Sequence, residues 1–251
     1  MELLDFYPSP SDLIESELAV LNHLRTDRYI KETHSQFARH ASMYLDRNRE
    51  DHSPGFEFVS YFDVWHAAVS RQDQRSANQG KRTPNVRLLL AVRIEANKRA
   101  FSNVTYCLTV CRIRSARIII LRKFHFDVTG GSDKSARRSQ RHPRSHLQYC
   151  GEMVPQMAEM GCRETQLNQM HPWLSEPRIF FWPMSLALLI DMALHEFPDE
   201  RSKKFREKPE WRGLVRRQEH LVLRRFYQKC VDVIVGTKGK SRTLAEEFYV
   251  G

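Results

Sequence analysis

Two short histidine-containing segments carry the side chains in this sequence that are best suited to proton transfer. The first contains His125 and Asp127, and the second contains His142, His146 and Gln148. Histidine exchanges a proton near neutral pH, and a neighbouring carboxylate can orient an imidazole for that exchange. This combination predicts general acid–base chemistry, with the three histidines as proton carriers and the aspartate as the orienting group.

The stretch between these segments is strongly basic. Five of the residues from Lys134 to Arg144 are lysine or arginine, and none is acidic. Guanidinium groups hold phosphates and stabilise the charge that develops on them. We therefore expect Arg138, Arg141 and Arg144 to contact a phosphate backbone, as a metal-independent ribonuclease would require. The competing interpretation is a polar network that fastens a loop to the edge of a sheet.

One alternative places part of this motif on a helix. Arg141 and His146 match the arginine–histidine spacing of helical HEPN ribonucleases. Pro143 lies between them, and inside a helix it would remove a backbone donor and clash with the preceding turn. The proline therefore disfavours this interpretation.

A second alternative is a metal-dependent enzyme. His125 and Asp127, with a distant histidine such as His171 or His195, have the composition of an iron facial triad, and Arg178 could bind an oxoacid co-substrate. Enzymes of that kind need a barrel with several strands after the histidine–aspartate pair. Only one or two short strands are expected there, so we expect no metal or other cofactor.

Several strands must position these groups. Apolar and polar residues alternate over 86–94, 104–110 and 117–128, which predicts three half-buried strands. Their connections are too short for helical crossovers, so the strands should form an antiparallel meander. A fourth strand is expected after Pro143, and 178–182 reads as a last strand or an extended segment. The sheet should therefore contain four to five strands.

The alternation also sorts side chains between the two faces of the sheet. Lys123, His125 and Asp127 fall on one face of their strand, opposite to its phenylalanines. His146 and Gln148 share a face of the following strand. If those two strands pair, their polar side chains converge on one face.

Helices are expected before and after the sheet. Helical spacing of apolar residues covers 9–24, 27–47 and 209–235, and a strongly apolar helix should begin at Pro183. The aromatic-rich stretch 56–69 is ambiguous, and we expect a short strand or turn followed by a helix.

These elements predict a single α+β domain over residues 1–251. It would have N-terminal helices in 1–75, the sheet in 84–150 and C-terminal helices in 183–251. No internal repeat or domain boundary interrupts this pattern.

The charge of the chain indicates an anionic partner. The net charge is +10 and the isoelectric point is about 9.6, values typical of proteins that contact polyanions. Arg217 and Arg224 lie on the basic side of the last long helix and could contact a nucleic-acid backbone, as could Arg178. We expect nucleic acid, RNA in particular, or a partner protein of the same operon.

Other features narrow the class of protein. The five cysteines form no C-x-x-C pair, which favours free thiols packed as small hydrophobes in a reducing compartment. The N-terminus lacks the pattern of a signal peptide and no apolar run is long enough to span a bilayer, so we expect a cytoplasmic protein without a membrane partner. Kinase, dehydrogenase and serine-hydrolase motifs are missing from the sequence.

The histidine segments also resemble motifs of certain uncharacterised bacterial families. The similarity covers about residues 117–198 and consists of an H-x-D strand followed by H-P-x-x-H-L-H/Q, with Gln148 in the last position here. Some of these families are thought to be toxin components or to lie near defence genes. The resemblance implies a bacterial anti-phage defence or toxin–antitoxin protein that acts on nucleic acid. A non-enzymatic adaptor or regulatory subunit, in which the same residues hold a loop for a partner protein, is the alternative.

Overall fold

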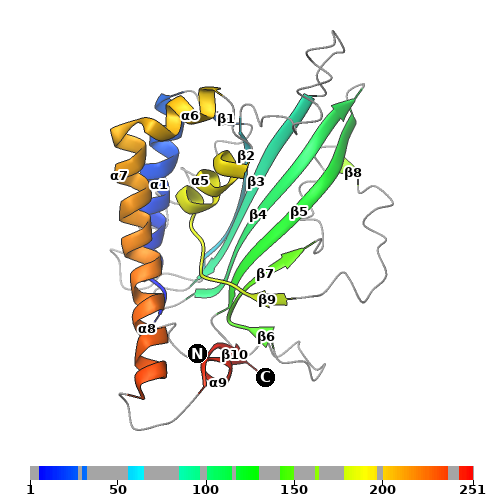
Figure 1. Ribbon diagram of the computed structural model, residues 1–251. Coiled ribbons are helices and arrows are strands. Elements are labelled where there is room, and N and C mark those ends of the chain that lie inside the picture. Colours follow the sequence, from blue (N-terminus) through cyan, green and yellow to red (C-terminus); the bar gives the residue numbers. More distant parts are fainter. Residues whose placement is uncertain are drawn as a thin grey trace.

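The structure is a computed structural model, and the account that follows concerns the residues it describes. Its helices, and the strands that pair with one another, are shown in Figure 1. The described residues are 6–27, 30–32, 56–64, 85–96, 101–114, 117–129, 142–149, 162–163, 178–196, 200–236 and 243–250.

A long antiparallel sheet forms the centre of the molecule. Its strands follow the order β1-β2-β3-β4-β5-β7-β9, and β8 adds a short parallel pairing to β5. The expected α+β class, with an antiparallel meander and helices before and after it, is confirmed. The strands are β1 (Ile30–Glu32), β2 (Phe56–Val64), β3 (Asn85–Ala96), β4 (Phe101–Arg114), β5 (Arg117–Thr129), β7 (Ser145–Tyr149), β8 (Cys162–Arg163) and β9 (Arg178–Phe180).

The sheet has more strands than the sequence predicted, because β1 and β2 extend the edge next to β3 and β8 pairs with β5. The helix expected over 27–47 is wrong at its start, since Ile30–Glu32 pairs with the end of β2. The rest of that stretch lies outside the described residues. The region from Phe56 to Val64 is a full strand that pairs with β3 along its whole length. Pairing with a long neighbouring strand decides the conformation of such ambiguous segments, because local propensity is weak.

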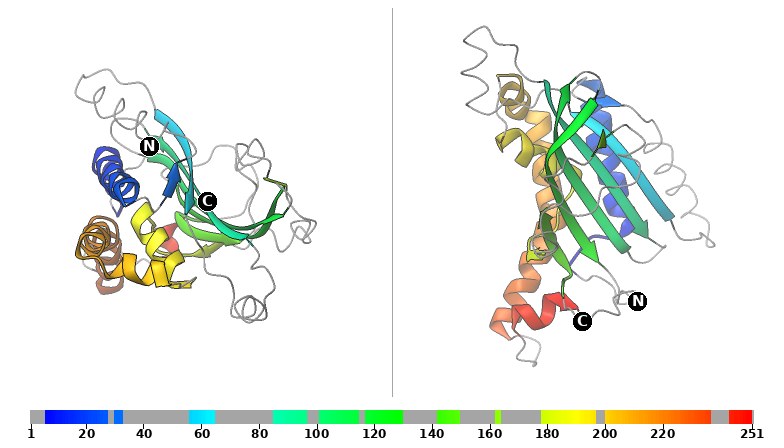
Figure 2. Two further views of the ribbon diagram at one scale, coloured as in Figure 1. Left: turned by 90° about the horizontal axis from the view of Figure 1, so that it is seen from above. Right: turned by 90° about the vertical axis from the view of Figure 1, so that its right-hand side faces the viewer.

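One face of the sheet packs against the helices. Seen from above in Figure 2, α1 (Pro10–Thr26), α5 (Leu186–Glu196), α6 (Glu200–Glu207) and α7 (Pro209–Gln218) lie on the same side of the curved sheet. The alternate residues of the central strands that face them are buried in a common core. These residues are Leu90, Val92, Ile94, Val104, Tyr106, Leu108, Val110, Phe126 and Val128.

The start of α1 is where its capping residues predict, whereas the apolar helix expected to begin at Pro183 begins at Leu186, as α5. The Ser9 hydroxyl accepts a hydrogen bond of 3.2 Å from the backbone N–H of Asp12, and Pro10 is the first residue of α1. The predicted helix over 209–235 is confirmed as α7, the π-helical segment η2 (Glu219–Leu223) and α8 (Arg224–Val235) in succession. Gly236 ends α8 with a φ of 69°, a left-handed conformation that glycine adopts without steric cost.

The C-terminal residues return to the sheet region. The strand β10 (Tyr249–Val250), which follows α9 (Leu244–Phe248), pairs with β6 (His142–Pro143) in a separate two-stranded sheet. Phe248 also packs with Phe6, Phe180 and Phe226, with ring centroids 5.3 to 5.4 Å from each of them. Among the described helices, none combines the length and apolar character that crossing a membrane requires.

Candidate active site on the polar face of the sheet

The register of the sheet brings the predicted acid–base residues together. In one row that crosses four strands, Cys107 of β4 lies opposite His125 of β5, which lies opposite Gln148 of β7. Gln148 in turn lies opposite Arg178 of β9. Directly opposite residues in an antiparallel pair have Cβ atoms about 4.5–5.5 Å apart, so neighbours in the row are within side-chain reach.

A second row lies beside the first, on the same face of the sheet. It contains Thr105 of β4, Asp127 of β5 and His146 of β7. Because Tyr106 and Phe126, the neighbours of these residues along the strands, point into the helical core, both rows lie on the opposite face. We call the residues that the two rows contribute from β4, β5 and β7, together with Lys123 and Thr109, the polar face.

Asp127 is the anionic centre of the polar face. One carboxylate oxygen accepts a hydrogen bond of 2.6 Å from the Thr105 hydroxyl, and the other lies 3.3 Å from Nε2 of His146. Burial raises the pKa of Asp127, but the hydrogen bond and charge of His146, with the charge of His125 and the Thr105 hydroxyl, outweigh it. The net shift is downward, so Asp127 is ionised and holds the His146 ring in place.

Cys107 and His125 form a second interacting pair. Both are buried, with 0% and 8% of their surfaces exposed, and they lie directly opposite each other in the register between β4 and β5. The sulfur also lies 3.6 Å from the Thr109 hydroxyl. Burial raises the pKa of Cys107, but its contacts with His125 and Thr109 and the charge of Lys123 give a net downward shift. Burial lowers the pKa of His125, but the thiol and Asp127 raise it above its usual value.

Lys123 adds a cation to the same face. It lies opposite Thr109 in the register and is completely buried, which is rare for lysine. Its charge favours the ionised form of Cys107 and opposes a positive charge on His125. The polar face therefore combines two imidazoles, an ammonium, a carboxylate and a thiol. Such a set can transfer two protons and stabilise a negative charge that develops between them.

The other histidines predicted to carry protons or bind metal lie elsewhere. His142 belongs to β6, where its backbone pairs with Val250 rather than with β5. His195 is exposed on α5 and contacts Arg206, and His171 lies outside the described residues. Within the described ranges, no group of three or more histidine, cysteine or acidic side chains has a metal-binding arrangement.

The predicted arginines are divided between the sheet and the helices. Arg144 joins β6 to β7, and its backbone N–H donates to the Phe248 carbonyl at 2.6 Å. Arg178 holds the end position of the first row. Arg217 and Arg224 are exposed on α7 and α8, in the helical layer. Arg138 and Arg141 lie outside the described residues. Since Ser145–Tyr149 is a strand, His146 does not have the helical placement that the HEPN spacing requires.

Four members of the polar face were not singled out in the sequence as site residues: Thr105, Cys107, Thr109 and Lys123. The alternation of polar and apolar residues over 104–110 placed Thr105 and Cys107 on one face. That signal could not identify their partners, because the partners depend on the register between strands. A one-residue slip would have turned every one of these side chains to the other face.

A second buried polar cluster lies on the helical side of the sheet. Glu17 of α1 is fully buried and accepts a hydrogen bond of 2.5 Å from the Tyr106 hydroxyl and one of 2.9 Å from the backbone N–H of Leu186. Burial raises the pKa of Glu17 to about 7, although these hydrogen bonds lower it. Its sequence signal was an acidic residue on the apolar stripe of a helix.

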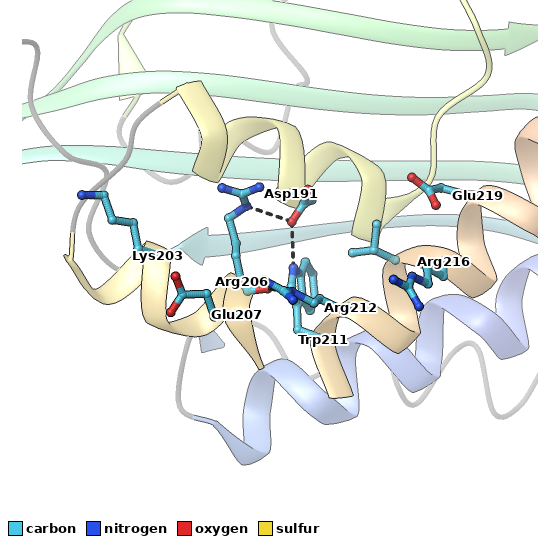
Figure 3. A pocket seen from close by; sticks show the side chains of 9 residues that line it. Asp191, Lys203, Arg206, Glu207, Trp211, Arg212, Arg216 and Glu219 are labelled. Carbon is cyan, nitrogen blue, oxygen red and sulfur yellow. Dashed lines mark hydrogen bonds and ion pairs between the residues drawn. The ribbon is translucent and has the colours of Figure 1, made fainter. Parts of the chain in front are cut away.

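The helical layer also contains an open pocket of about 390 Å³, drawn in Figure 3. Asp191 in its wall accepts hydrogen bonds from Nε of Arg206 at 3.1 Å and from Nε1 of Trp211 at 2.9 Å. Arg212 and Arg216 line the same pocket, with Glu219 beside them. Because its cations and carboxylates are mixed, the pocket has no strong excess of either charge. None of the site residues predicted from the sequence lines it.

The comparisons with known proteins leave the function to be argued from this geometry. No family model, no curated protein and no solved structure matches the chain.

Proposed function

We propose that this protein binds RNA and cleaves it without a metal ion, using the histidines of the polar face. One observation carries the proposal: His125 and His146 occupy adjacent rows of one sheet face, with Asp127 against His146 and the ammonium of Lys123 on the same face. Metal-independent cleavage needs a base, an acid and a cation near the phosphate, and this face contains all three.

The proposed reaction is an in-line transfer at phosphorus. One imidazole removes the proton of the ribose 2′-hydroxyl, which attacks the phosphorus, and the other donates a proton to the departing 5′-oxygen. Because the Asp127 carboxylate lies against Nε2 of His146, we assign the proton to Nε2 when the ring is neutral, so that Nδ1 exchanges the proton with the substrate. Lys123 stabilises the negative charge of the pentavalent phosphate.

Basic residues around the molecule would bind the rest of the RNA. The helical segment 200–236 contains eleven basic and five acidic residues, so it holds more than half of the net charge of +10. Arg217 and Arg224 are exposed there, whereas Arg144 and Arg178 lie next to the polar face. We assign these four arginines to backbone phosphates. We further propose that the protein acts in the bacterial cytoplasm, as part of an anti-phage defence or toxin–antitoxin system.

The test is RNA cleavage in the presence of EDTA. We expect purified protein to degrade fluorescently labelled RNA, and His125→Asn or His146→Asn to lower the rate constant by about 10²–10⁴-fold. His195→Asn is the matched control, because it makes the same chemical change at an exposed histidine on α5. Intact RNA with the wild-type protein, or equal rates in all variants, would end the proposal.

A second candidate function, the adaptor, is favoured by a different feature. On α8, four large apolar side chains are exposed at helical spacing: Tyr227, Val231, Ile234 and Val235. Exposed apolar stripes of this kind mark protein–protein contacts. If the chain is an adaptor, co-expression with the products of neighbouring genes should give a complex in size-exclusion chromatography. That complex should be lost in Ile234→Asp and retained in His146→Asn, and the opposite pattern would exclude the adaptor.

A further inference from the structure

We propose that Cys107 and His125 form a thiolate–imidazolium pair within the polar face. The pair would keep His125 protonated, so that His125 is the acid of the cleavage reaction and His146 is the base. Cys107 is then a positioning residue that acts through His125. The assignment of acid and base rests on the proposed function, whereas the ion pair itself does not.

The geometry of the two strands supports a direct proton transfer within the pair. Cys107 and His125 are opposite each other in the register between β4 and β5 and are both buried, so the sulfur and the imidazole ring are within side-chain reach of each other. The proton moves from Sγ to the imidazole, which leaves a thiolate and an imidazolium and requires no other reactant. The pair remains neutral as a whole, so burial penalises it far less than a single isolated charge.

The surrounding groups decide the direction of this transfer. On β4, the Thr109 hydroxyl is 3.6 Å from the sulfur and can donate to it. On β5, Lys123 stabilises the thiolate and Asp127 stabilises the imidazolium. His146 of β7 lies against Asp127 and therefore influences the pair only through that carboxylate. Two basic residues hold register positions at the ends of the rows, Arg93 of β3 opposite Thr105 and Arg178 of β9 opposite Gln148.

One atom of His125 points to its use as an acid. Its Nε2 atom is buried and has no hydrogen-bond partner among the described residues. A buried donor without a partner costs about 1–3 kcal/mol, so such atoms in a stable fold are often reserved for a ligand. We assign to Nε2 the proton that reaches the departing oxygen of the substrate. The neighbouring thiol distinguishes His125 from His146, which is buried to a similar degree but is held by a carboxylate.

The ion pair can be tested without any activity. A thiolate absorbs near 240 nm, where a thiol does not. We expect the wild-type protein to retain a thiolate band below about pH 7, as activated cysteines do, and Cys107→Ser to lack it. Cys230→Ser is the control, because the Cys230 thiol is half-buried on α8 and burial raises its pKa. Removing it should leave the band unchanged.

Two further measurements test whether His125 is the partner of the Cys107 thiolate. In His125→Gln the thiolate band should appear only at higher pH, and in Cys107→Ser the NMR titration of the His125 ring should move to lower pH. Circular dichroism must first show that each variant is folded, and Cys107→Ala replaces Cys107→Ser if it is not. A band that is the same in wild type and folded Cys107→Ser would overturn the ion pair.

RNA cleavage then separates this inference from the proposed function. If both are correct, Cys107→Ser shifts the alkaline limb of the cleavage profile to lower pH while cleavage at acidic pH persists. A thiolate band in a protein that leaves RNA intact would refute the ribonuclease and keep the ion pair. Cleavage without such a band, and with an unshifted profile in Cys107→Ser, would refute the ion pair alone.

Discussion

Each face of the central sheet carries a carboxylate with little exposure to solvent, and the two carboxylates behave in opposite ways. Glu17 lies on the helical side and has a pKa raised to about 7. Asp127 lies on the polar face and has a pKa below its usual value. The two sites lie on opposite sides of the same strand. Tyr106, which donates a hydrogen bond to Glu17, is followed directly on β4 by Cys107 of the polar face.

The difference teaches that burial alone does not set the charge of a buried acid. Among the described residues, the donors to Glu17 are neutral, namely the Tyr106 hydroxyl and the N–H of Leu186, and these do not compensate for the loss of water. Asp127 meets His146 and His125, and the Thr105 hydroxyl adds a third favourable contact. The charge of the partners decides which carboxylate stays ionised. The face with the ionised carboxylate is the one suited to acid–base chemistry.

The largest effect should follow from removing the ionised carboxylate. Asp127→Asn removes the anion that faces the charge of His125 and that accepts from His146 and the Thr105 hydroxyl, which should reduce the free energy of unfolding at pH 7 by about 3–5 kcal/mol. The measurement is urea denaturation, with the exposed Glu200→Gln as the control, expected to change by less than about 0.5 kcal/mol.

The same variant tests whether the free energy of unfolding falls or rises with pH in the acidic range. Because the folded pKa of Asp127 is lowered, its stabilisation is complete above the unfolded value of about 3.9 and is lost as the pH falls through the folded pKa. Asp127→Asn should lack that acidic loss. A similar acidic loss in the variant would show that other carboxylates cause it.

The neutral carboxylate, Glu17, should make the free energy of unfolding depend on pH in the opposite direction. The pKa of Glu17 rises from 4.5 to about 7 on folding, so its favourable contribution is complete below pH 4.5 and is lost as the pH rises to about 7. Across that interval the wild type should lose about 3 kcal/mol of unfolding free energy. The slope of unfolding free energy against pH in this interval should disappear in Glu17→Gln. It should persist in Glu15→Gln, which changes the exposed side of the same helix. An unchanged slope in Glu17→Gln would contradict the comparison.

Removing one of the neutral donors to Glu17 should have a smaller effect on the free energy of unfolding. Tyr106→Phe removes the hydroxyl that donates to Glu17 at 2.5 Å, which should cost about 1–2 kcal/mol near neutral pH. Since that hydrogen bond lowers the pKa of Glu17, its loss should move the slope to higher pH. Denaturation across the pH range measures both effects. Tyr227→Phe, on an exposed side chain, should produce neither, and a shift to lower pH in Tyr106→Phe would refute this assignment.

The smallest effect on folding is expected from the exposed charges of the helical layer. Arg217→Gln and Arg224→Gln should each change the unfolding free energy by less than about 0.5 kcal/mol. If they contact RNA, each should lower the slope of log affinity against log salt by about 1. Filter binding at several salt concentrations gives these slopes. Lys204→Gln, which makes a similar change at an exposed position of α6, tests whether the loss is specific to α7 and α8.

Much of the fold followed from local patterns. Period-two alternation predicted β3, β4 and β5, and capping residues predicted the start of α1. The short segments were less predictable. Ile30–Glu32 became a strand only because β2 offers it an edge to pair with. A three-residue strand has no periodicity of its own from which it could be predicted.

The candidate site was partly predictable for the same reason. The sequence by itself determined that His125 and Asp127 share one face of their strand, and that His146 and Gln148 share a face of theirs, because side chains alternate along any strand. Only the tertiary structure decided that Asp127 meets His146 and that His125 meets Cys107. It also decided that Glu17 is buried among neutral donors. These contacts depend on register and on packing between residues far apart in the chain, and the strength and sign of each charge effect depend on distance and burial.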